Sequence, residues 1–550
     1  MATEPVRPGE EAITSSVAPR RVPDWVILTL ACVAQFMVLL DVSIVNVALP
    51  AMKVSLGFSE SGLQWVLNAY TLTFAGFLLL GGRTADLFGR RRVFLIGLAV
   101  FTGASLLGGF AENQTMLIVA RAVQGLGGAI LSPTTLTILT TTFTEPKART
   151  KAMGIWSAVA GAGGAAGALL GGVLTETLSW RWILFINIPI GVVAFVAARL
   201  FLQERRVSGE RQPLDLPGAV LVTAGLTALV FGVVRSTASG WGGSETLGSL
   251  AAAAVLIAWF LFHEARVATA PLMPLRMFSR RSISTANLVM FLLSGALFAM
   301  WFFISLYLQQ VKGWSPLRTG FAFLPQTVAI VAGAQISSRL VLRTGARLLL
   351  VIGGLLSAGG LFWLSDLGVA TGYWSGFFVP SVAIALGLGL SFTPLAFAAT
   401  SGVPPNEAGL ASGLVNTSRQ IGGAIGLAAL TTVATSTMAS TLGHVQGHAG
   451  SGAGSVAALL RVRAMAAGYD RAFLVSSVIA LGAAVAALAV PARGSHTAAA
   501  RVAGAQVPAA SDAEVQVRGD SESEPATEPA TETEPATEPA TEPATEPALD

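Results

Sequence analysis

Residues 25–50 read WVILTLACVAQFMVLLDVSIVNVALP, an apolar run that is interrupted near its end by Asp41. A run of this length can cross the ~30 Å hydrocarbon core of a bilayer as a helix. An ionised carboxylate is costly in such surroundings unless it is paired, hydrated or protonated. The stretch therefore predicts a membrane-spanning helix in which Asp41 has a specific partner or function.

The composition of the whole chain also indicates a membrane protein. Of its 550 residues, 53% are hydrophobic and only 12% are charged, whereas soluble proteins have about 25% charged residues. The single cysteine, Cys32, cannot form an intrachain disulfide. The formal net charge of +4 combines a basic body with an acidic C-terminal tail. In a membrane protein such an asymmetry reports on topology, so we expect a lipid bilayer and no nucleic acid as partner.

Apolar runs recur along the chain and predict an all-α polytopic membrane protein with fourteen transmembrane helices. The predicted spans are 25–49, 63–82, 93–111, 115–138, 152–174, 182–202, 216–234, 247–263, 285–308, 320–342, 347–365, 373–396, 409–434 and 471–491. Lys and Arg concentrate in every second loop, for example at 90–92, 205–211 and 276–281. Because positive loops stay in the cytoplasm, we predict a multi-pass protein of the cell membrane with both termini cytoplasmic.

Three polar segments lie outside the predicted spans. We expect residues 1–24 to form a disordered cytoplasmic tail, and residues 492–550 to form a second one that ends in acidic EPAT repeats. The loop at about 435–470 contains SVAALLRVRAM. This segment is either a short amphipathic helix on the membrane surface or part of a mobile loop.

The loop after the second span reads GGRTADLFGRRRVF over residues 81–94. Gly82 and Gly89 permit a tight turn between two helices. Asp86 can accept hydrogen bonds at a helix end, while Arg90 and Arg91 anchor the inner surface. An ordinary positively charged loop is the alternative interpretation.

Polar residues and glycines also recur inside the spans. Residues 117–130 read LIVARAVQGLGGAI, where Arg121 and Gln124 share one helix face. An arginine at membrane depth faces a cavity or a charged partner. In the fifth span Gly163, Gly167 and Gly171 form one stripe, which brings another backbone close or lets the helix flex.

These motifs, in this order, resemble those of the major facilitator superfamily, and within it the fourteen-helix drug:proton antiporters. GGRTADLFGRRR resembles the loop signature G-x-L-a-D-r-x-G-r-R, and the sequence from Arg121 resembles R-x-x-Q-G. The run from Gly163 to Gly172 resembles the antiporter motif G-x-x-x-G-P-x-x-G-G, with Ala168 in place of proline. LDVSIVNVALP and SWRWILFINIPIG resemble motifs of the first and sixth helices. In the loop signature, Thr84 and Leu87 replace Leu and Arg.

The resemblance implies the major facilitator fold, in which two six-helix halves surround a central cavity. The halves would be 25–202 and 282–491, and the linker 203–281 would supply two extra central helices. It also implies efflux of amphipathic drugs or antibiotics in exchange for protons, by alternating access. We therefore expect a small organic substrate and protons as partners, a monomer, and no cofactor.

Asp41 and Arg121 should lie at similar depths in the bilayer. Asp41 is about 16 residues into its span, or roughly 24 Å at 1.5 Å per residue, and Arg121 is about 9 Å below the outer edge. The resemblance places the first and fourth helices beside the same cavity. We therefore expect an Asp41–Arg121 pair, direct or through water. Its role is either proton coupling or a fixed ion pair that holds two helices together.

Polar and aromatic side chains within the spans are candidates for substrate binding. They are Gln64, Asn68, Gln124, Asn416, Arg419, Trp301 and Tyr307. Gln64 and Asn68 share a helix face, as residues four apart do. Arg419 has no acid on its own helix, and three partners remain open for it: an acid of another helix, a row of carbonyls, or an anionic part of a substrate.

Two other classes of function compete with drug efflux. One is uptake of a small nutrient, either uncoupled or by symport. The other is a polytopic membrane enzyme, or the membrane subunit of an ATP-driven pump. An enzyme would need clustered ligands or nucleophiles at membrane depth, but the four histidines lie at span ends or in loops, and no P-loop sequence occurs. We therefore expect neither an enzyme nor a metal site.

Overall fold

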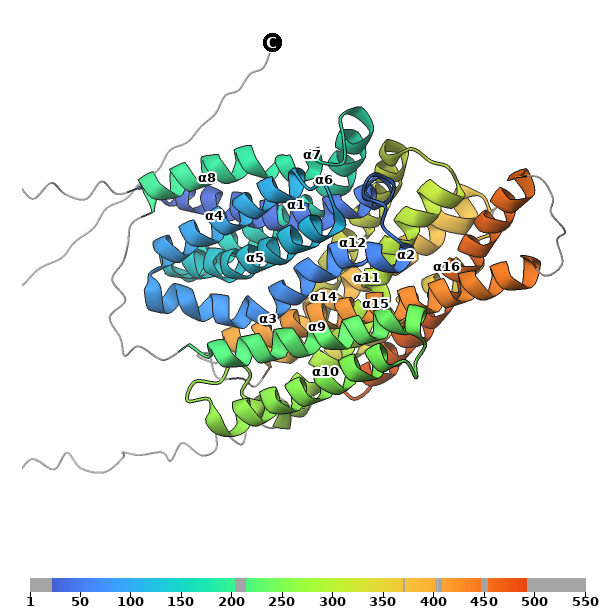
Figure 1. The fold of residues 1–550 in the computed structure, drawn as a ribbon. Helices are drawn as coiled ribbons and strands as arrows, with labels where there is room; N and C mark the ends of the chain where they lie inside the picture. Colours follow the sequence, from blue (N-terminus) through green and yellow to red (C-terminus); the bar gives the residue numbers. More distant parts are fainter. Residues whose placement is uncertain are drawn as a thin grey trace, which may run out of the picture. The chain divides into compact units, whose positions relative to one another are not determined.

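The computed structural model describes residues 22–202, 214–368, 371–401, 403, 408–446 and 454–491. The EPAT repeats and nearly all of the predicted N-terminal tail lie outside these residues. Within them the chain forms helices and no strand. The fold and its labels are shown in Figure 1.

The helices are named in chain order. The first eight are α1 (Asp24–Leu56), α2 (Glu60–Leu63), α3 (Trp65–Phe88), α4 (Arg90–Gly109), α5 (Gln114–Thr142), α6 (Pro146–Thr177), α7 (Trp182–Phe185) and α8 (Asn187–Phe201). The central segments are α9 (Leu216–Ser239), α10 (Ser244–Phe262), η1 (His263–Val267) and η2 (Leu275–Ser279). The remaining ones are α11 (Arg281–Leu306), η3 (Tyr307–Val311), α12 (Pro316–Thr344), α13 (Ala346–Leu364), η4 (Trp374–Phe378), α14 (Val379–Thr400), α15 (Ala408–Gln446) and α16 (Gly454–Ala487).

Thirteen helical segments of the described chain are long and apolar enough to cross a membrane. They coincide with thirteen of the fourteen predicted spans. The other predicted span, 152–174, lies inside α6, a helix of 32 residues. The prediction of an all-α polytopic membrane protein is confirmed.

Single glycines make the tightest links between helices. Gly89 joins α3 to α4 with a φ of 93°, and Gly345 joins α12 to α13 with a φ of 82°. A positive φ is readily available only to glycine, so each helix pair turns within one residue. Gly82 was also predicted to form the turn, but that prediction is wrong, because Gly82 lies within helix α3 beside Pro133.

The predicted loop at 435–470 is largely helical. Helix α15 continues to Gln446, and α16 begins at Gly454, so SVAALLRVRAM forms the first turns of a membrane-spanning helix. Both interpretations of this segment, a surface helix and a mobile loop, are therefore wrong. Ala, Leu, Arg and Met are strong helix formers, which explains why the helix extends beyond the apolar run.

The two sets of six spans repeat the same packing. In the first set α1 packs on α6, α3 on α5, and α4 on α5. In the second set the equivalent contacts join α11 to α15, α12 to α14, and α13 to α14. This repetition is typical of transporters that are built from internal repeats.

The two extra spans, α9 and α10, pack on each other (Figure 1). Helix α9 also contacts α3 of the first half and α15 of the second. A cluster of apolar side chains joins the three helices, with Leu72 on α3, Leu226 and Val230 on α9, and Ala424 and Ala428 on α15. The extra helices therefore lie along the seam between the halves.

The halves also meet at the end of the bundle that we predict to face outward. Ser305 Oγ of α11 donates a hydrogen bond to the carbonyl oxygen of Asn46 in α1, at 2.6 Å. The Leu317 N–H at the start of α12 donates to Glu176 Oε2 of α6, at 2.8 Å. Hydrogen bonds from Ser315 and from this N–H hold the pKa of the Glu176 carboxyl below its ordinary value. These contacts join the two halves at that end.

We predict that Gly320→Leu opens this end, because a Cβ atom at Gly320 would lie 2.6 Å from the Ala168 carbonyl oxygen of α6. A cysteine reporter at Asn46, in a Cys32→Ser background, would measure the change. A membrane-impermeant maleimide added to intact cells should label the reporter about tenfold faster when Gly320 is replaced, since a gap between the halves admits the reagent. Gly359→Leu, which has open space around it on α13, is the control. Equal labelling rates would contradict the prediction.

Candidate functional site

Asp41 of α1 and Arg121 of α5 form a direct ion pair. Arg121 Nη1 lies 2.5 Å from Asp41 Oδ2, and the side chains are 0% and 1% exposed. Each charge alone would be very unfavourable in this position, so each accounts for the presence of the other. The expected pair is thus present as a direct contact. Its role in proton coupling remains a prediction.

Two amides complete the coordination of the carboxylate. Asp41 Oδ1 accepts hydrogen bonds from Gln124 Nε2 at 2.7 Å and from Asn187 Nδ2 at 3.0 Å. Both amides also donate to Ser105 Oγ, at 2.6 and 3.2 Å. All five side chains are buried. They bring α1, α4, α5 and α8 together around one carboxylate.

Arg121 is held equally closely. Its Nη1 also donates to Gln124 Oε1 at 2.6 Å, and its Nε donates to the Val66 carbonyl oxygen of α3 at 3.1 Å. The guanidinium carbon lies 4.5 Å from the centre of the Tyr70 ring. A planar group with several donors in fixed directions can make this set of contacts, whereas the ammonium group of lysine cannot reproduce it.

The glycine stripe of α6 packs on α1 at the residues around Asp41. A Cβ atom at Gly163 would lie 2.9 Å from the Phe36 carbonyl oxygen, and one at Gly167 would lie 2.8 Å from the Leu40 carbonyl oxygen. A Cβ atom at Gly171 would lie 2.7 Å from the carbonyl oxygen of Ile44. The stripe thus permits backbone contact between the two helices. Gly172 faces elsewhere, toward Pro316 and Leu317 at the start of α12.

Gln64 and Asn68 lie on α3 or at its start, near the residues that contact Arg121. Both are buried, and Asn68 Nδ2 donates to Gln64 Oε1 at 3.5 Å. Gln64 Nε2 donates to the Ser61 carbonyl oxygen at 2.9 Å. Asn68 Oδ1 has no hydrogen-bond partner among the described residues. Their binding role remains a prediction.

The predicted substrate residues of the second half do not form one cluster. Arg419 contacts Asn416 on its own helix. Trp301 Nε1 donates to Gln326 Oε1 at 3.1 Å. Tyr307 donates to the Gly368 carbonyl oxygen at 2.9 Å, beside a small cavity at the end of the bundle. Tyr307 is therefore committed to a loop contact and is not grouped with the Asp41 network.

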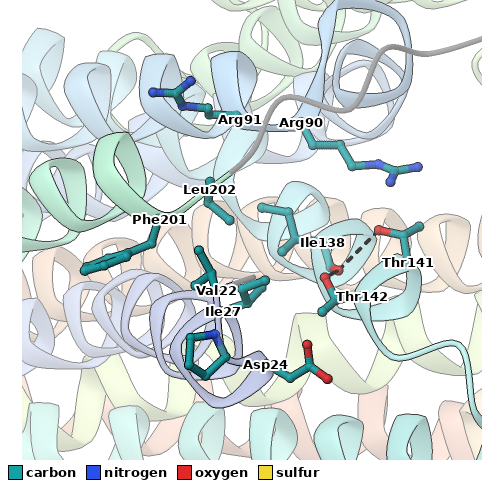
Figure 2. Close-up of a pocket in the computed structure, with 11 residues that line it drawn as sticks. Val22, Asp24, Ile27, Arg90, Arg91, Ile138, Thr141, Thr142, Phe201 and Leu202 are labelled. Carbon is teal, nitrogen blue, oxygen red and sulfur yellow. Dashed lines mark hydrogen bonds between the residues drawn. The ribbon is translucent and has the colours of Figure 1, made fainter. Parts of the chain in front are cut away.

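Arg90 and Arg91 of the 81–94 segment line a pocket of about 560 Å³, at the ends of α1, α4, α5 and α8 that we predict to face the cytoplasm (Figure 2). The side chains of Arg90 and Arg91 point to opposite sides in this view. Arg91 Nη2 donates to the Arg199 carbonyl oxygen of α8 at 2.7 Å. Arg83 donates to the carbonyl oxygens of Ala270 and Pro271, beyond α10. The side chain of Asp86 lies outside the described part of the chain.

Sequence reasoning did not identify Asn187 and Ser105. Asn187 lies within SWRWILFINIPIG, which resembles a motif of the superfamily, so the motif contained the signal. Ser105 is a lone serine in the third span, and serines are common in membrane helices. Ser105 joins the network only because α4 is oriented with this side chain toward Gln124 of α5 and Asn187 of α8.

The sequence profile of the Major Facilitator Superfamily matches residues 31–427. The chain belongs to this superfamily. It is therefore a membrane transporter, as predicted, and the prediction that it is not an enzyme agrees with this assignment.

Several relatives of this major facilitator are antibiotic exporters or resistance proteins. The cephamycin export protein CmcT of Amycolatopsis lactamdurans is 48% identical over 408 residues, which cover 74% of this chain and 84% of that protein. The puromycin resistance protein pur8 of Streptomyces alboniger is 41% identical over 78% of this chain and 84% of that protein. A bacterial homologue of the human lysosomal transporter Spinster has the same fold, with a TM-score of 0.59 and 16% identity over 84% of this chain and 96% of that one.

We predict that Gly167→Leu reduces transport about tenfold or more while the protein is still made, because a leucine would force α6 away from α1. Transport into inverted vesicles, normalised to protein content, measures the effect. Gly164→Leu on the same helix is the matched control, since a Cβ atom there meets open space. Normal transport by the Gly167 variant would show that the close contact is dispensable.

Proposed function

We propose that this transporter exports amphipathic drugs or antibiotics in exchange for protons. The names of its relatives support export of such compounds. The observation that carries the proton exchange is the buried Asp41 carboxylate, whose three donors all come from side chains that can rearrange.

Protonation of Asp41 would change this network in a defined way. The proton neutralises the carboxylate and leaves the charge of Arg121 uncompensated in a site that is 1% exposed. A buried charge that loses its partner costs about 3–5 kcal/mol. The network lowers this free energy by rearranging, so that Arg121 reaches another acceptor or water. Proton binding is thereby linked to the position of α5 relative to α1.

Helix α1 can transmit this change to the second half. Asn46 and Val47 follow Asp41 by about one and a half helical turns. Their carbonyl oxygens accept hydrogen bonds from Ser305 of α11 and from Gln309 of η3. A shift of α1 at Asp41 therefore acts directly on the contacts that join the two halves at the predicted outer end. This is the link that exchange of a proton for a substrate requires.

The proposal includes the topology that the charge pattern predicts. Both termini are cytoplasmic, the halves 25–202 and 282–491 rock about the central cavity, and the linker 203–281 joins them. The tails 1–24 and 492–550 remain in the cytoplasm, and one chain is the working unit.

Inverted vesicles with an imposed proton gradient test the exchange: adding a substrate should dissipate the gradient. Substrate movement without any proton flux would favour uncoupled uptake instead.

We predict that Asp41→Asn abolishes gradient-driven transport into inverted vesicles, with a loss of about a hundredfold or more. The amide keeps the size of the side chain and can still accept from Arg121, but it cannot bind and release a proton at working pH. Gel filtration should show that the variant is folded. Asp24→Asn, which removes an exposed acid from the same helix, should transport normally. Full uphill transport by Asp41→Asn would show that the Asp41 carboxylate has only a structural role.

Arg121→Lys separates a specific network from a plain counter-ion. Lysine keeps the charge but loses the planar fork that contacts Asp41, Gln124 and the Val66 carbonyl. We predict that proton flux coupled to substrate falls about tenfold or more. The double variant Arg121→Gln with Asp41→Asn should remain folded but uncoupled. Near-normal coupled flux in Arg121→Lys would mean that Arg121 is only a counter-ion in a fixed ion pair.

A further inference from the structure

Arg419 is a second arginine within the membrane-spanning part, and no acid of the described residues pairs with it. It lies in α15, half-buried, where its Nε and Nη2 donate to Asn416 Oδ1 of the same helix at 3.1 and 2.9 Å. Among the described residues, Arg419 forms no ion pair, whereas Arg121 pairs with Asp41. The other guanidinium N–H groups of Arg419 have no partner in the described chain.

The other faces of α15 are occupied by neighbouring helices. Ser418 Oγ donates to Asn287 Oδ1 of α11 at 2.8 Å, and Gly422 packs on the backbone of α11. Thr417 and Ile421 line an apolar cavity that is shared with α3, α9 and α10. Residue 419 is about 200° around the helix from both 417 and 421, at 100° per residue. The guanidinium therefore points away from the extra helices.

The helix that carries Arg419 faces the first half. Helix α15 packs on α3, which carries Tyr70. Tyr70 is the ring that stacks on Arg121, and its buried hydroxyl has no hydrogen-bond partner among the described residues. Arg419 thus lies on the helix of the second half that packs against α3.

The charges in this region do not balance. Arg121 and Asp41 neutralise each other, and Arg419 adds one positive charge without a described anion. An unpaired cation at membrane depth is costly, and a guanidinium forms its strongest contacts with carboxylate, sulfonate or phosphate groups, often through two parallel hydrogen bonds. An anion that arrives and leaves with each transport cycle would compensate the charge. Asn416 holds one edge of the guanidinium, which leaves the other edge free to bind it.

We propose that the substrates of this exporter are amphipathic organic anions whose acidic group binds Arg419. This inference rests on the proposed export function and adds the charge class of the substrate.

Two xanthene dyes of opposite charge test the proposal: fluorescein, which is anionic, and rhodamine 123, which is cationic. Fluorescence anisotropy would measure their binding to the purified full-length protein in lipid nanodiscs. We expect wild type to bind fluorescein about tenfold more tightly than rhodamine 123. Arg419→Gln should weaken fluorescein binding about tenfold, the loss of one charge-assisted contact, and leave rhodamine 123 binding nearly unchanged. Arg461→Gln, which removes an exposed arginine of α16, is the matched control and should change neither.

A second variant covers the case in which Arg419→Gln does not purify as a folded protein. Arg419→Lys keeps the charge without the fork, and we expect a several-fold loss of fluorescein binding only. No fluorescein binding in wild type, a preference for rhodamine 123, or equal losses for both dyes would overturn the proposal. Equilibrium binding involves no proton gradient. If the protein exchanges rhodamine 123 for protons and does not bind fluorescein, the proposed function stands and this inference is wrong. If it binds fluorescein through Arg419 but moves no protons, this inference stands and the proposed function is wrong.

Discussion

The buried ion pair between Asp41 and Arg121 is the constraint around which the first half is organised. Removing two charges from water costs several kcal/mol for each ion, and this is recovered only when the geometry is close and the remaining hydrogen-bonding positions are filled. Here Gln124 and Asn187 fill those positions, so helices from three parts of the chain must meet at one carboxylate. The glycines of α6 have a related effect. They allow α6 to support α1 from another side without side chains between the two backbones.

In the proposed mechanism, helix α1 connects the proton site to the movement of the two halves. Asp41 binds the ion-pair network, while the next turn of the same helix contacts α11 of the other half. Both interactions depend on the position of one rigid element, so neither can change without affecting the other. The second half offers a different chemistry. Its arginine, Arg419, is held by a neutral amide rather than by an acid, which leaves its charge available to a ligand.

Much of this arrangement could be predicted from the sequence, because lipid restricts what an apolar chain can do. The lengths of the runs predicted the spans. The similar depths of Asp41 and Arg121, together with the helix arrangement that the family resemblance implies, predicted their contact. The sequence did not indicate which short polar side chains would join them, since Ser105 and Asn187 depend on how each helix is rotated in the bundle. It also could not reveal that Tyr307 bonds to the Gly368 carbonyl or that Arg83 bonds to the segment after α10. Those contacts join residues far apart in the chain and are fixed only by tertiary packing.

The position of α9 has a consequence for how the two halves are covered where they meet. The halves meet along two seams, one where α3 faces α15 and one where α6 faces α12. Helix α9 covers the first seam, since its apolar side chains contact both α3 and α15. The second seam has no equivalent cover among the described helices. The two seams are therefore shielded unequally from the surroundings of the bundle: an added helix lies over one of them, and the other is held by direct contact between α6 and α12.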